Sequence, residues 1–345
     1  MTVDDDILFE VEGALGRVHL NAPATFNSLT REMCIAFRDR LVAWRDDCAI
    51  AAVLVTAGER AFCAGGDIRR LYDIGRADPI LGRTFFWHEY RLDHAVHEFP
   101  KPYVALVDGI VMGGGVGISV HGSHRIVTEN TTFAMPECGI GLFPDVGATE
   151  FLDRAPGALG VYLGLTGARL KAADAILAGF GTHFVPSARL DELATGLAGN
   201  LDAIDAYITG FAEDPGTPPL DEHRHLIDRH FTASSVADII AGLDAEDGYW
   251  AIETADDLRE KSPTSLCVTL RQLRDGRGLG FEAVMRLEYR MACAFLAGHD
   301  FFEGIRAAVI DKDRKPKWAP ARLDEVDADA IAAYFAPVTP ELDLD

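Results

Sequence analysis

Short apolar runs of strand length alternate with glycine-containing turns through the first part of the chain. Ile7–Val11 and Arg17–Asn21 flank Gly13–Gly16, a pattern that predicts a β-hairpin. Ala51–Thr56 and Tyr103–Val107 are almost continuously apolar and rich in β-branched residues, which is typical of strands buried on both faces. The pattern therefore predicts a sheet whose central strands are covered by other elements.

Helical spacing appears between these strands and dominates the last third of the chain. Thr30 is placed to cap one helix, and a helix over 81–97 carries Glu89 on an otherwise apolar face. Strand, glycine turn and helix recur with a loose period, which predicts stacked β-β-α turns. Asp214–Pro219 is the clearest linker signal. We therefore expect an α/β core over residues 1–215 and a helical C-terminal region over residues 220–345.

Composition narrows the classes of partner. The 345 residues include 32 Lys and Arg against 54 Asp and Glu, a formal net charge of −22. A surface this acidic disfavours nucleic acid and anionic membranes as partners. Arg69, Arg70 and Arg76 form a local basic cluster, so an anionic small molecule is still compatible with the sequence.

Cysteine usage and the N-terminus bear on the compartment. The six cysteines are scattered without a CxxC pair, as in a reduced intracellular chain. The N-terminal stretch MTVDDDILFEV is acidic and lacks the features of a signal peptide. No apolar segment is long enough to span a bilayer. A cytoplasmic protein is the expectation.

Two glycine turns each follow a buried strand. Residues 64–66 form one, and residues 113–115 form the other. Two backbone amides from separate turns can converge on one carbonyl oxygen that becomes an anion during a reaction. For a lone glycine triplet we would favour a role in close helix packing, but the presence of two turns favours a binding function. Neither a GKS or GKT sequence nor GxGxxG spacing is present, which excludes a phosphate loop.

Two acidic residues follow the second glycine turn in apolar surroundings. Glu137 ends the stretch Phe133–Glu137, and Asp145 lies within Leu142–Gly147. A single acid of this kind more often caps a helix or pairs with an arginine, whereas two of them near a glycine turn favour an active site. The alternatives for Glu89, a site residue or a partly exposed helix edge, are evenly balanced.

Other chemistries find less support in the sequence. His88 and Glu89 are not completed to HExxH, and no other histidine pair has a third ligand nearby, so no metal is expected. No G-x-S-x-G motif is present, which disfavours a serine hydrolase. Cys63 and Cys138 lie close to the predicted site, where a small buried filler is favoured over a nucleophile.

Several long segments give the chain a family resemblance. AFCAGGDI and KPYVALVDGIVMGGGVGISVHGSHRIVTENTTFAMPECGIGLFPDVGA resemble the crotonase (enoyl-CoA hydratase/isomerase) superfamily. SPTSLCVTLRQL and EYRMACAFLAGHDFFEGIRAAVIDKDRKPKW resemble a thioester-hydrolase branch of it, which extends beyond the shorter hydratases. The resemblance covers most of the chain. It implies an α/β fold in which repeated β-β-α turns form a spiral with an extended helical C-terminal region.

The resemblance also implies roles for the predicted site residues. The amides of Gly66 and Gly114 would form an oxyanion hole for a thioester carbonyl. Glu137 would be the retained catalytic glutamate, and Asp145 would be the second catalytic acid, found in the hydrolase branch. The residues implied to bind substrate are Gly66, Asp67 and Ile68 for coenzyme A, and Glu89, Gly114, Glu137 and Asp145 for the acyl group.

One departure from the hydratase pattern bears on the reaction. Hydratases carry a second glutamate where this chain has Gly117, and their two carboxylates together hold the water that adds to a C=C bond. Asp145 supplies an acid where hydratases usually have a small residue. The resemblance thus implies hydrolysis of a short, branched 3-hydroxyacyl-CoA in valine breakdown. Glu137 would either attack the carbonyl or activate a water.

Two alternatives stay open: an enoyl-CoA hydratase or isomerase, and a non-catalytic acyl-CoA-binding protein. In each case the partner is an acyl-CoA small molecule, coenzyme A is part of the substrate, and no cofactor or metal is expected. Relatives commonly form trimers or pairs of trimers, so a homo-oligomer is a further expectation.

Overall fold

The chain divides into two compact units in the computed structural model, which describes residues 3–58 and 60–345. Residues 1 and 2 of the acidic N-terminal stretch lie outside the described residues. The first unit consists of the residues up to Gly66 with Arg91–Ala134 and Arg169–Pro219, and the second of Asp67–Tyr90, Met135–Ala168 and Leu220–Asp345. The division predicted at 215–220 falls at one of these junctions, and two earlier segments also group with the C-terminal residues.

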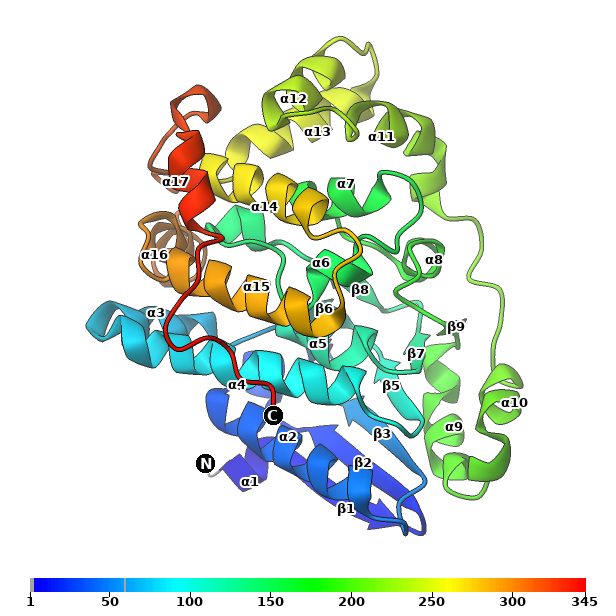
Figure 1. Cartoon of the computed structure of the whole chain (residues 1–345). Coiled ribbons are helices and arrows are strands. Elements are labelled where there is room, and N and C mark those ends of the chain that lie inside the picture. Colours follow the sequence, from blue (N-terminus) through cyan, green and yellow to red (C-terminus); the bar gives the residue numbers. More distant parts are fainter. Residues whose placement is uncertain (1–2, 59) are drawn as a thin grey trace. The chain divides into compact units, whose positions relative to one another are not determined.

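The first unit is built on two sheets (Figure 1). The larger has the strand order β1-β2-β3-β5-β7-β9, in which β1 and β2 form the predicted antiparallel hairpin and the other neighbours are parallel. The smaller, β4-β6-β8, is parallel throughout. The strands are Ile7–Glu12 (β1), Leu15–Leu20 (β2), Ala52–Ala57 (β3), Ala61–Cys63 (β4), Tyr103–Val107 (β5), Ile110–Met112 (β6), His124–Val127 (β7), Thr132–Ala134 (β8) and His183–Phe184 (β9).

From β3 to β9, consecutive strands alternate between the two sheets. β3, β5 and β7 join the larger sheet, and the strand that follows each of them joins the smaller one. Helix α5 (Gly114–Val120) then follows β6. The predicted repetition of strand pairs and helices is therefore confirmed. Because β4 and β6 are parallel neighbours, the turns that follow them leave the smaller sheet at the same edge.

Helices cover both faces of the larger sheet. Leu15 belongs to an apolar core shared with α9 (Leu190–Leu197) and α10 (Ile204–Thr209). The next residue, Gly16, faces the other way and meets Trp44 of α2 (Arg31–Asp46), which Figure 1 shows lying across β1–β3. The Thr30 hydroxyl oxygen accepts a hydrogen bond from the Met33 amide at 3.2 Å, which confirms the predicted cap of α2.

Shorter elements complete the first unit. They are α1 (Val3–Asp6), η1 (Pro23–Thr25), α8 (Ala172–Leu177), η3 (Ser187–Arg189) and η4 (Leu201–Ala203). Helix α4 (Pro79–His97), predicted over 81–97, contains residues of both units.

The second unit is helical. Tyr162 of α7 meets the rings of Phe231 and Trp250 at centroid distances of 5.2 and 5.7 Å, which ties α7 to the helices α11–α13 that Figure 1 shows gathered with α14. The elements are α3 (Ile68–Ala77), η2 (Glu137–Ile140), α6 (Ala148–Phe151), α7 (Leu159–Thr166), η5 (Pro219–His223), α11 (Arg224–His230), α12 (Val236–Asp244), α13 (Tyr249–Glu260), α14 (Pro263–Asp275), α15 (Phe281–Phe295), α16 (Asp300–Ile305), η6 (Arg306–Ile310), η7 (Leu323–Glu325) and α17 (Ala328–Ala333).

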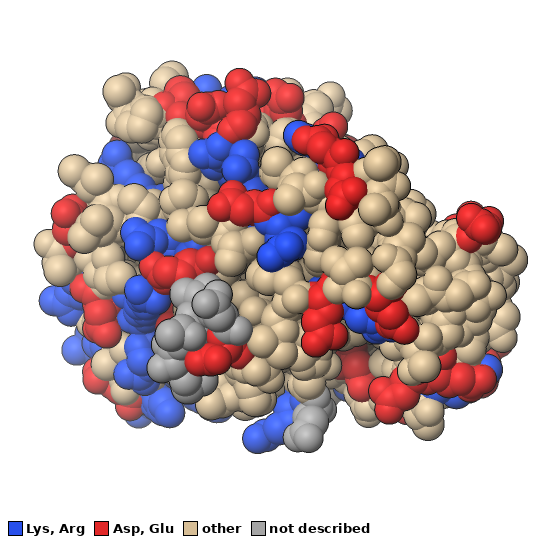
Figure 2. All heavy atoms as spheres, turned by 90° about the horizontal axis from the view of Figure 1, so that it is seen from below, with Lys and Arg blue, Asp and Glu red and all other residues tan. Residues whose placement is uncertain are grey.

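Charged residues of both signs are interspersed on the face drawn in Figure 2, with uncharged surface between them. The acidic excess is therefore not gathered there into one patch. Within the described residues, no helix combines the length and apolarity needed to cross a membrane.

Gly115 lets α5 lie directly against β4, because a Cβ there would stand 2.3 Å from the Cys63 carbonyl oxygen. Gly115→Ala is therefore expected to destabilise the fold by about 1–3 kcal/mol. Urea unfolding of the variant measures this loss. Gly199→Ala is the matched control, since the atom nearest to its added Cβ, the Gly196 oxygen, is 3.7 Å away. Equal unfolding midpoints for the two variants would contradict the packing argument.

Candidate active site

The two glycine turns predicted to bind a ligand lie side by side in the first unit. Gly65 follows β4 with φ 101°, and Gly113 follows β6 with φ 47°, both in the region that favours glycine. A Cβ built on Gly65 would stand 3.1 Å from the Met112 oxygen and 3.6 Å from the Gly114 nitrogen. No larger residue at position 65 would let the two turns approach this closely.

The amides of Gly66 and Gly114 belong to these adjacent turns. Gly114 begins α5, so its N–H has no acceptor within the helix. Within residues 3–58 and 60–345, neither amide donates a hydrogen bond. Leu29 steadies the first turn by donating its amide to the Gly65 oxygen at 2.8 Å. Two uncommitted amides in neighbouring, partly buried turns are donors of the kind that an oxyanion hole requires.

Of the residues predicted to line coenzyme A, Gly66 lies in the first glycine turn, and Asp67 and Ile68 lie at the start of α3. The Asp67 carboxylate caps this helix by accepting a hydrogen bond from the Arg70 amide at 3.0 Å, and Ile68 is its first residue. The Arg69 guanidinium donates to the Val309 carbonyl oxygen at 2.8 Å. The Asp67 side chain is thus used within the helix, and a ligand would meet backbone groups there.

All three predicted acids are buried, and all belong to the second unit. Glu137 is the first residue of η2 and is 5% exposed, while Asp145, in the turn before α6, is 4% exposed. Glu89 in α4 is 2% exposed, so it is not a partly exposed helix edge. The apolar surroundings seen in the sequence therefore correspond to burial of each carboxyl group.

Burial changes the protonation of Glu137 and Asp145. It raises the pKa of Asp145 to about 7, although a hydrogen bond donated by the Tyr90 hydroxyl at 2.7 Å acts to lower it. Burial and the negative charge of Asp145 together raise the pKa of Glu137 well above its usual value. Both carboxyl groups therefore keep a proton to higher pH than exposed acids do.

One oxygen of this pair is left without a partner. Glu137 Oε2 is buried and has no hydrogen-bond partner among the described residues. A buried polar atom of this kind is costly to leave unsatisfied, and a role in binding or catalysis is one explanation for it. Glu137 therefore combines burial, a raised pKa and an uncommitted oxygen, which are the properties of a carboxylate that acts on a ligand.

The sequence did not single out four further residues around Asp145. They are Tyr90, Thr149, Gln272 and Glu288. Tyr90 binds Asp145 directly, and Glu288 accepts hydrogen bonds from the turn that follows it. Glu288 could have been found by the signal that drew attention to Glu89. It falls at helical spacing on the buried, otherwise apolar face of α15.

The two cysteines near the predicted site are buried. Burial raises the pKa of Cys138 to about 12, which disfavours the thiolate that a nucleophile needs at neutral pH. Its sulfur lies 3.3 Å from the Thr269 hydroxyl and 3.4 Å from the Gly164 oxygen. Cys63 packs beneath Gly115. These contacts fit the role of small buried fillers.

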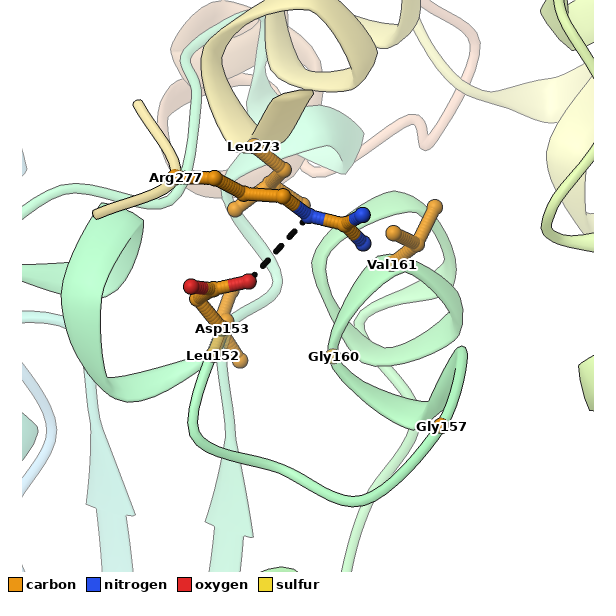
Figure 3. A pocket seen from close by; sticks show the side chains of 7 residues that line it. All are labelled: Leu152, Asp153, Gly157, Gly160, Val161, Leu273 and Arg277. Atoms are coloured by element: carbon orange, nitrogen blue, oxygen red, sulfur yellow. Dashed lines mark ion pairs between the residues drawn. The ribbon is translucent and has the colours of Figure 1, made fainter. Parts of the chain in front are cut away.

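A small hollow in the second unit lies apart from the predicted residues (Figure 3). Its polar side is occupied by an ion pair, in which Arg277 Nε is 3.2 Å from Asp153 Oδ1. The hollow is lined by Leu152, Asp153, Gly157, Gly160, Val161, Leu273 and Arg277. In the part of the chain that the structure describes, no group of three or more His, Cys, Asp or Glu residues is arranged to hold a metal ion.

Comparison with known proteins gives consistent matches across the chain. The family model described as enoyl-CoA hydratase/isomerase matches residues 15–335. The mitochondrial 3-hydroxyisobutyryl-CoA hydrolase of Gallus gallus is 43% identical, over 96% of this chain and 89% of its own length.

Two solved structures resemble this chain over nearly their full length. One, titled a carnitinyl-CoA dehydratase from Mycobacterium thermoresistibile, has a TM-score of 0.95 and 47% identity, covering 99% of both chains. The other, titled an enoyl-CoA hydratase from Rhodobacter sphaeroides 2.4.1, has a TM-score of 0.92 and 42% identity, covering 98% of this chain and 99% of that one.

Asp145→Asn is expected to stabilise the fold at alkaline pH. Because burial raises the pKa of Asp145 from 3.8 to about 7, the folded state disfavours its charged form and loses stability as the pH rises through this window. Above it, the neutral asparagine gains on the order of 1–4 kcal/mol. The gain shrinks as the pH falls from about 7 and vanishes below about 4, where the aspartate is protonated in both states.

Thermal unfolding midpoints across this pH range measure the effect. Asp39→Asn, at an exposed position of α2, is the control. A stabilisation by Asp145→Asn that does not change with pH would contradict the assigned cause.

Proposed function

The chain belongs to the enoyl-CoA hydratase/isomerase family, and from this premise we propose that it hydrolyses a short 3-hydroxyacyl-CoA thioester. The proposed substrate is 3-hydroxyisobutyryl-CoA, and the products are 3-hydroxyisobutyrate and coenzyme A. The 43% identity to the hydrolase of Gallus gallus over 96% of the chain supports this choice. A role in valine breakdown, implied by the family resemblance, is part of the proposal.

The observation that carries the proposal is the buried pair of Glu137 and Asp145. Hydrolysis of a thioester needs an electron pair delivered to the carbonyl carbon and a proton for the departing sulfur. In the proposed reaction the two buried carboxyl groups supply these between them, since a group with a raised pKa can hold a proton at neutral pH and an ionised one can deliver electrons. The uncommitted Oε2 of Glu137 makes this residue the group that acts on the acyl carbon.

In the proposed mechanism, the amides of Gly66 and Gly114 donate hydrogen bonds to the thioester oxygen. They stabilise the negative charge that develops there when the carbonyl carbon becomes tetrahedral. Two routes use Glu137 differently. Its carboxylate attacks the carbon, expels the thiolate and leaves an anhydride that water cleaves, or it takes a proton from a water that attacks directly. In both routes the thiolate gains one proton, and the sum is thioester plus water giving acid plus thiol.

Asp145 and Glu89 are proposed to hold the 3-hydroxyl group of the acyl chain. Both side chains are buried, so the hydroxyl group would donate to a carboxyl oxygen that is shielded from water, a contact that a substrate without it would not make. Recognition of this kind discriminates far more strongly than a pocket that measures only the size of an alkyl group.

The second candidate is addition or removal of water at a C=C bond, which the titles of the two full-length structural matches name for those proteins. Gly117 argues against it here, because helix α5 provides no carboxylate at that position. A decrease in crotonyl-CoA absorbance without release of free thiol would identify this activity. A non-catalytic acyl-CoA-binding protein would bind the ester without either change.

The proposal also covers how coenzyme A is bound, whether the chain assembles and where it is located. Coenzyme A enters as part of the substrate, Gly66, Asp67 and Ile68 bind it through backbone groups, and no cofactor is assigned. Assembly into a homo-oligomer stays a prediction. So does a cytoplasmic location; the relative from Gallus gallus is named as a mitochondrial protein.

Glu137→Gln is expected to reduce thiol release from 3-hydroxyisobutyryl-CoA by about a hundred- to ten-thousandfold, because the amide can neither attack nor accept a proton. Binding of the CoA ester, followed by calorimetry, should be retained. Glu192→Gln, at an exposed position of α9, is the matched control. Near-full activity of the Glu137 variant would remove this residue from the mechanism.

Substrate selectivity gives a separate prediction. With 3-hydroxyisobutyryl-CoA and isobutyryl-CoA, which differ in the 3-hydroxyl alone, kcat/KM for thiol release should differ by about a thousandfold or more. Asp145→Asn should narrow this ratio by lowering the rate for the hydroxylated ester. A ratio near one in the wild type would show that the hydroxyl group is not recognised.

A further inference from the structure

The turn that carries Asp145 has an unfavourable backbone conformation. Val146 has φ 54° and Gly147 has φ 87°, so two consecutive residues are left-handed. Glycine tolerates this conformation, but a β-branched valine rarely adopts it. Such a turn persists only where the surrounding structure holds it in place.

The Glu288 carboxylate accepts hydrogen bonds from this turn at both of its oxygens. Oε2 accepts from the Gly147 amide at 2.7 Å. Oε1 accepts from the Thr149 amide at 2.9 Å and from the Thr149 hydroxyl at 2.7 Å. Glu288 is fully buried on α15, so these contacts are shielded from water. A buried carboxylate thus binds the residues that immediately follow Asp145.

Gln272 extends these contacts to the residue before Asp145. Its Nε2 donates to the Pro144 carbonyl oxygen at 2.7 Å and to the Thr149 hydroxyl oxygen at 2.9 Å. Gln272 is itself fully buried on α14. Both ends of the turn are therefore bound to helices of the C-terminal region, and the Tyr90 hydroxyl binds the Asp145 carboxylate between them.

We propose that Glu288 is a positioning residue, which holds the 145–149 turn so that the Asp145 carboxylate meets the Tyr90 hydroxyl and the acyl group. The inference rests on the proposed function, because the role of Asp145 does. Glu288 is not assigned to the reaction itself, since both of its oxygens already accept hydrogen bonds from the turn.

Burial raises the pKa of Glu288 to about 8, although the hydrogen bonds from Thr149 and Gly147 act to lower it. Its ionised form is the one that can accept hydrogen bonds at both oxygens. The two amides that face Glu288 are donors, and both of its oxygens are acceptors. A glutamine has one oxygen and one NH₂ group, so one backbone N–H would face another donor and lose its hydrogen bond. Glu288→Gln therefore preserves the size of the side chain and removes the acceptor that the turn requires.

A crystal structure of the Glu288→Gln variant tests the positioning without reference to any reaction. We expect the 145–149 turn to shift and the distance from the Tyr90 hydroxyl to Asp145 Oδ2 to exceed about 3.5 Å. Glu282→Gln, which removes an exposed carboxylate of the same helix, should leave both unchanged. An unmoved turn with the Tyr90–Asp145 hydrogen bond intact would overturn the proposal even if the protein proves to be no thioesterase.

A double-mutant cycle tests whether the effect on the reaction passes through Asp145. Glu288→Gln should lower kcat for thiol release by about a hundredfold. KM should change by less than about threefold, because contacts with the rest of the ester are retained. In an Asp145→Asn background, Glu288→Gln should lower kcat no further. An equal loss in both backgrounds would overturn the proposal, whereas absence of thiol release by the wild type would overturn the proposed function alone.

Thr149→Val provides the same test should Glu288→Gln fail to fold. It removes the hydroxyl that donates to Glu288 and accepts from Gln272, and it leaves both backbone amides in place. We expect a fall in kcat of roughly tenfold or less that again disappears in the Asp145→Asn background. A fall that persists there would overturn the assignment.

Discussion

The second unit depends on hydrogen bonds to its buried carboxyl groups, and the donors are distributed unequally among these groups. Each of these groups would be strongly disfavoured in a protein interior without partners. Glu288 receives backbone donors at both oxygens, and Asp145 receives the Tyr90 hydroxyl. Glu137 Oε2 receives no donor among the described residues. The same chemical group thus serves as a structural acceptor at one position, and at another it is left with an oxygen free for the proposed reaction.

This distribution gives the C-terminal helices a role beyond covering apolar surface. Gln272 on α14 and Glu288 on α15 supply the contacts that hold a turn more than a hundred positions earlier in the chain. The turn contains a left-handed valine, which short-range interactions alone would not maintain. The helices therefore determine where Asp145 lies, although they contribute none of the residues proposed to react.

The elements that were predicted from sequence are those determined by local patterns. The hairpin of β1 and β2, the buried strands and the Thr30 cap follow from periodicity and from contacts within a few residues. The glycine turns could be located for the same reason, and their proximity then follows from the parallel pairing of β4 with β6. The contacts of Glu288 could not be predicted, because its partners lie far away in sequence. Its place on an apolar helix face showed only that it would be buried.

The positions of the carboxyl groups bear on which reaction is proposed, hydration of a C=C bond or hydrolysis of a thioester. A hydratase must orient one water between two carboxylates, whereas a hydrolase must deliver electrons to the acyl carbon and a proton to sulfur. In this chain position 117 is a glycine, so α5 has no acid there. Asp145 lies on a different turn, where the Tyr90 hydroxyl donates a hydrogen bond to its carboxylate. Burial and the Asp145 charge raise the pKa of Glu137, and burial raises that of Asp145, so both groups of the proposed pair can hold a proton near neutral pH. A single buried acid would supply either the proton or the carboxylate, but not both at once. For a thioester, whose leaving group departs as an anion unless it is protonated, the pair is the simpler arrangement.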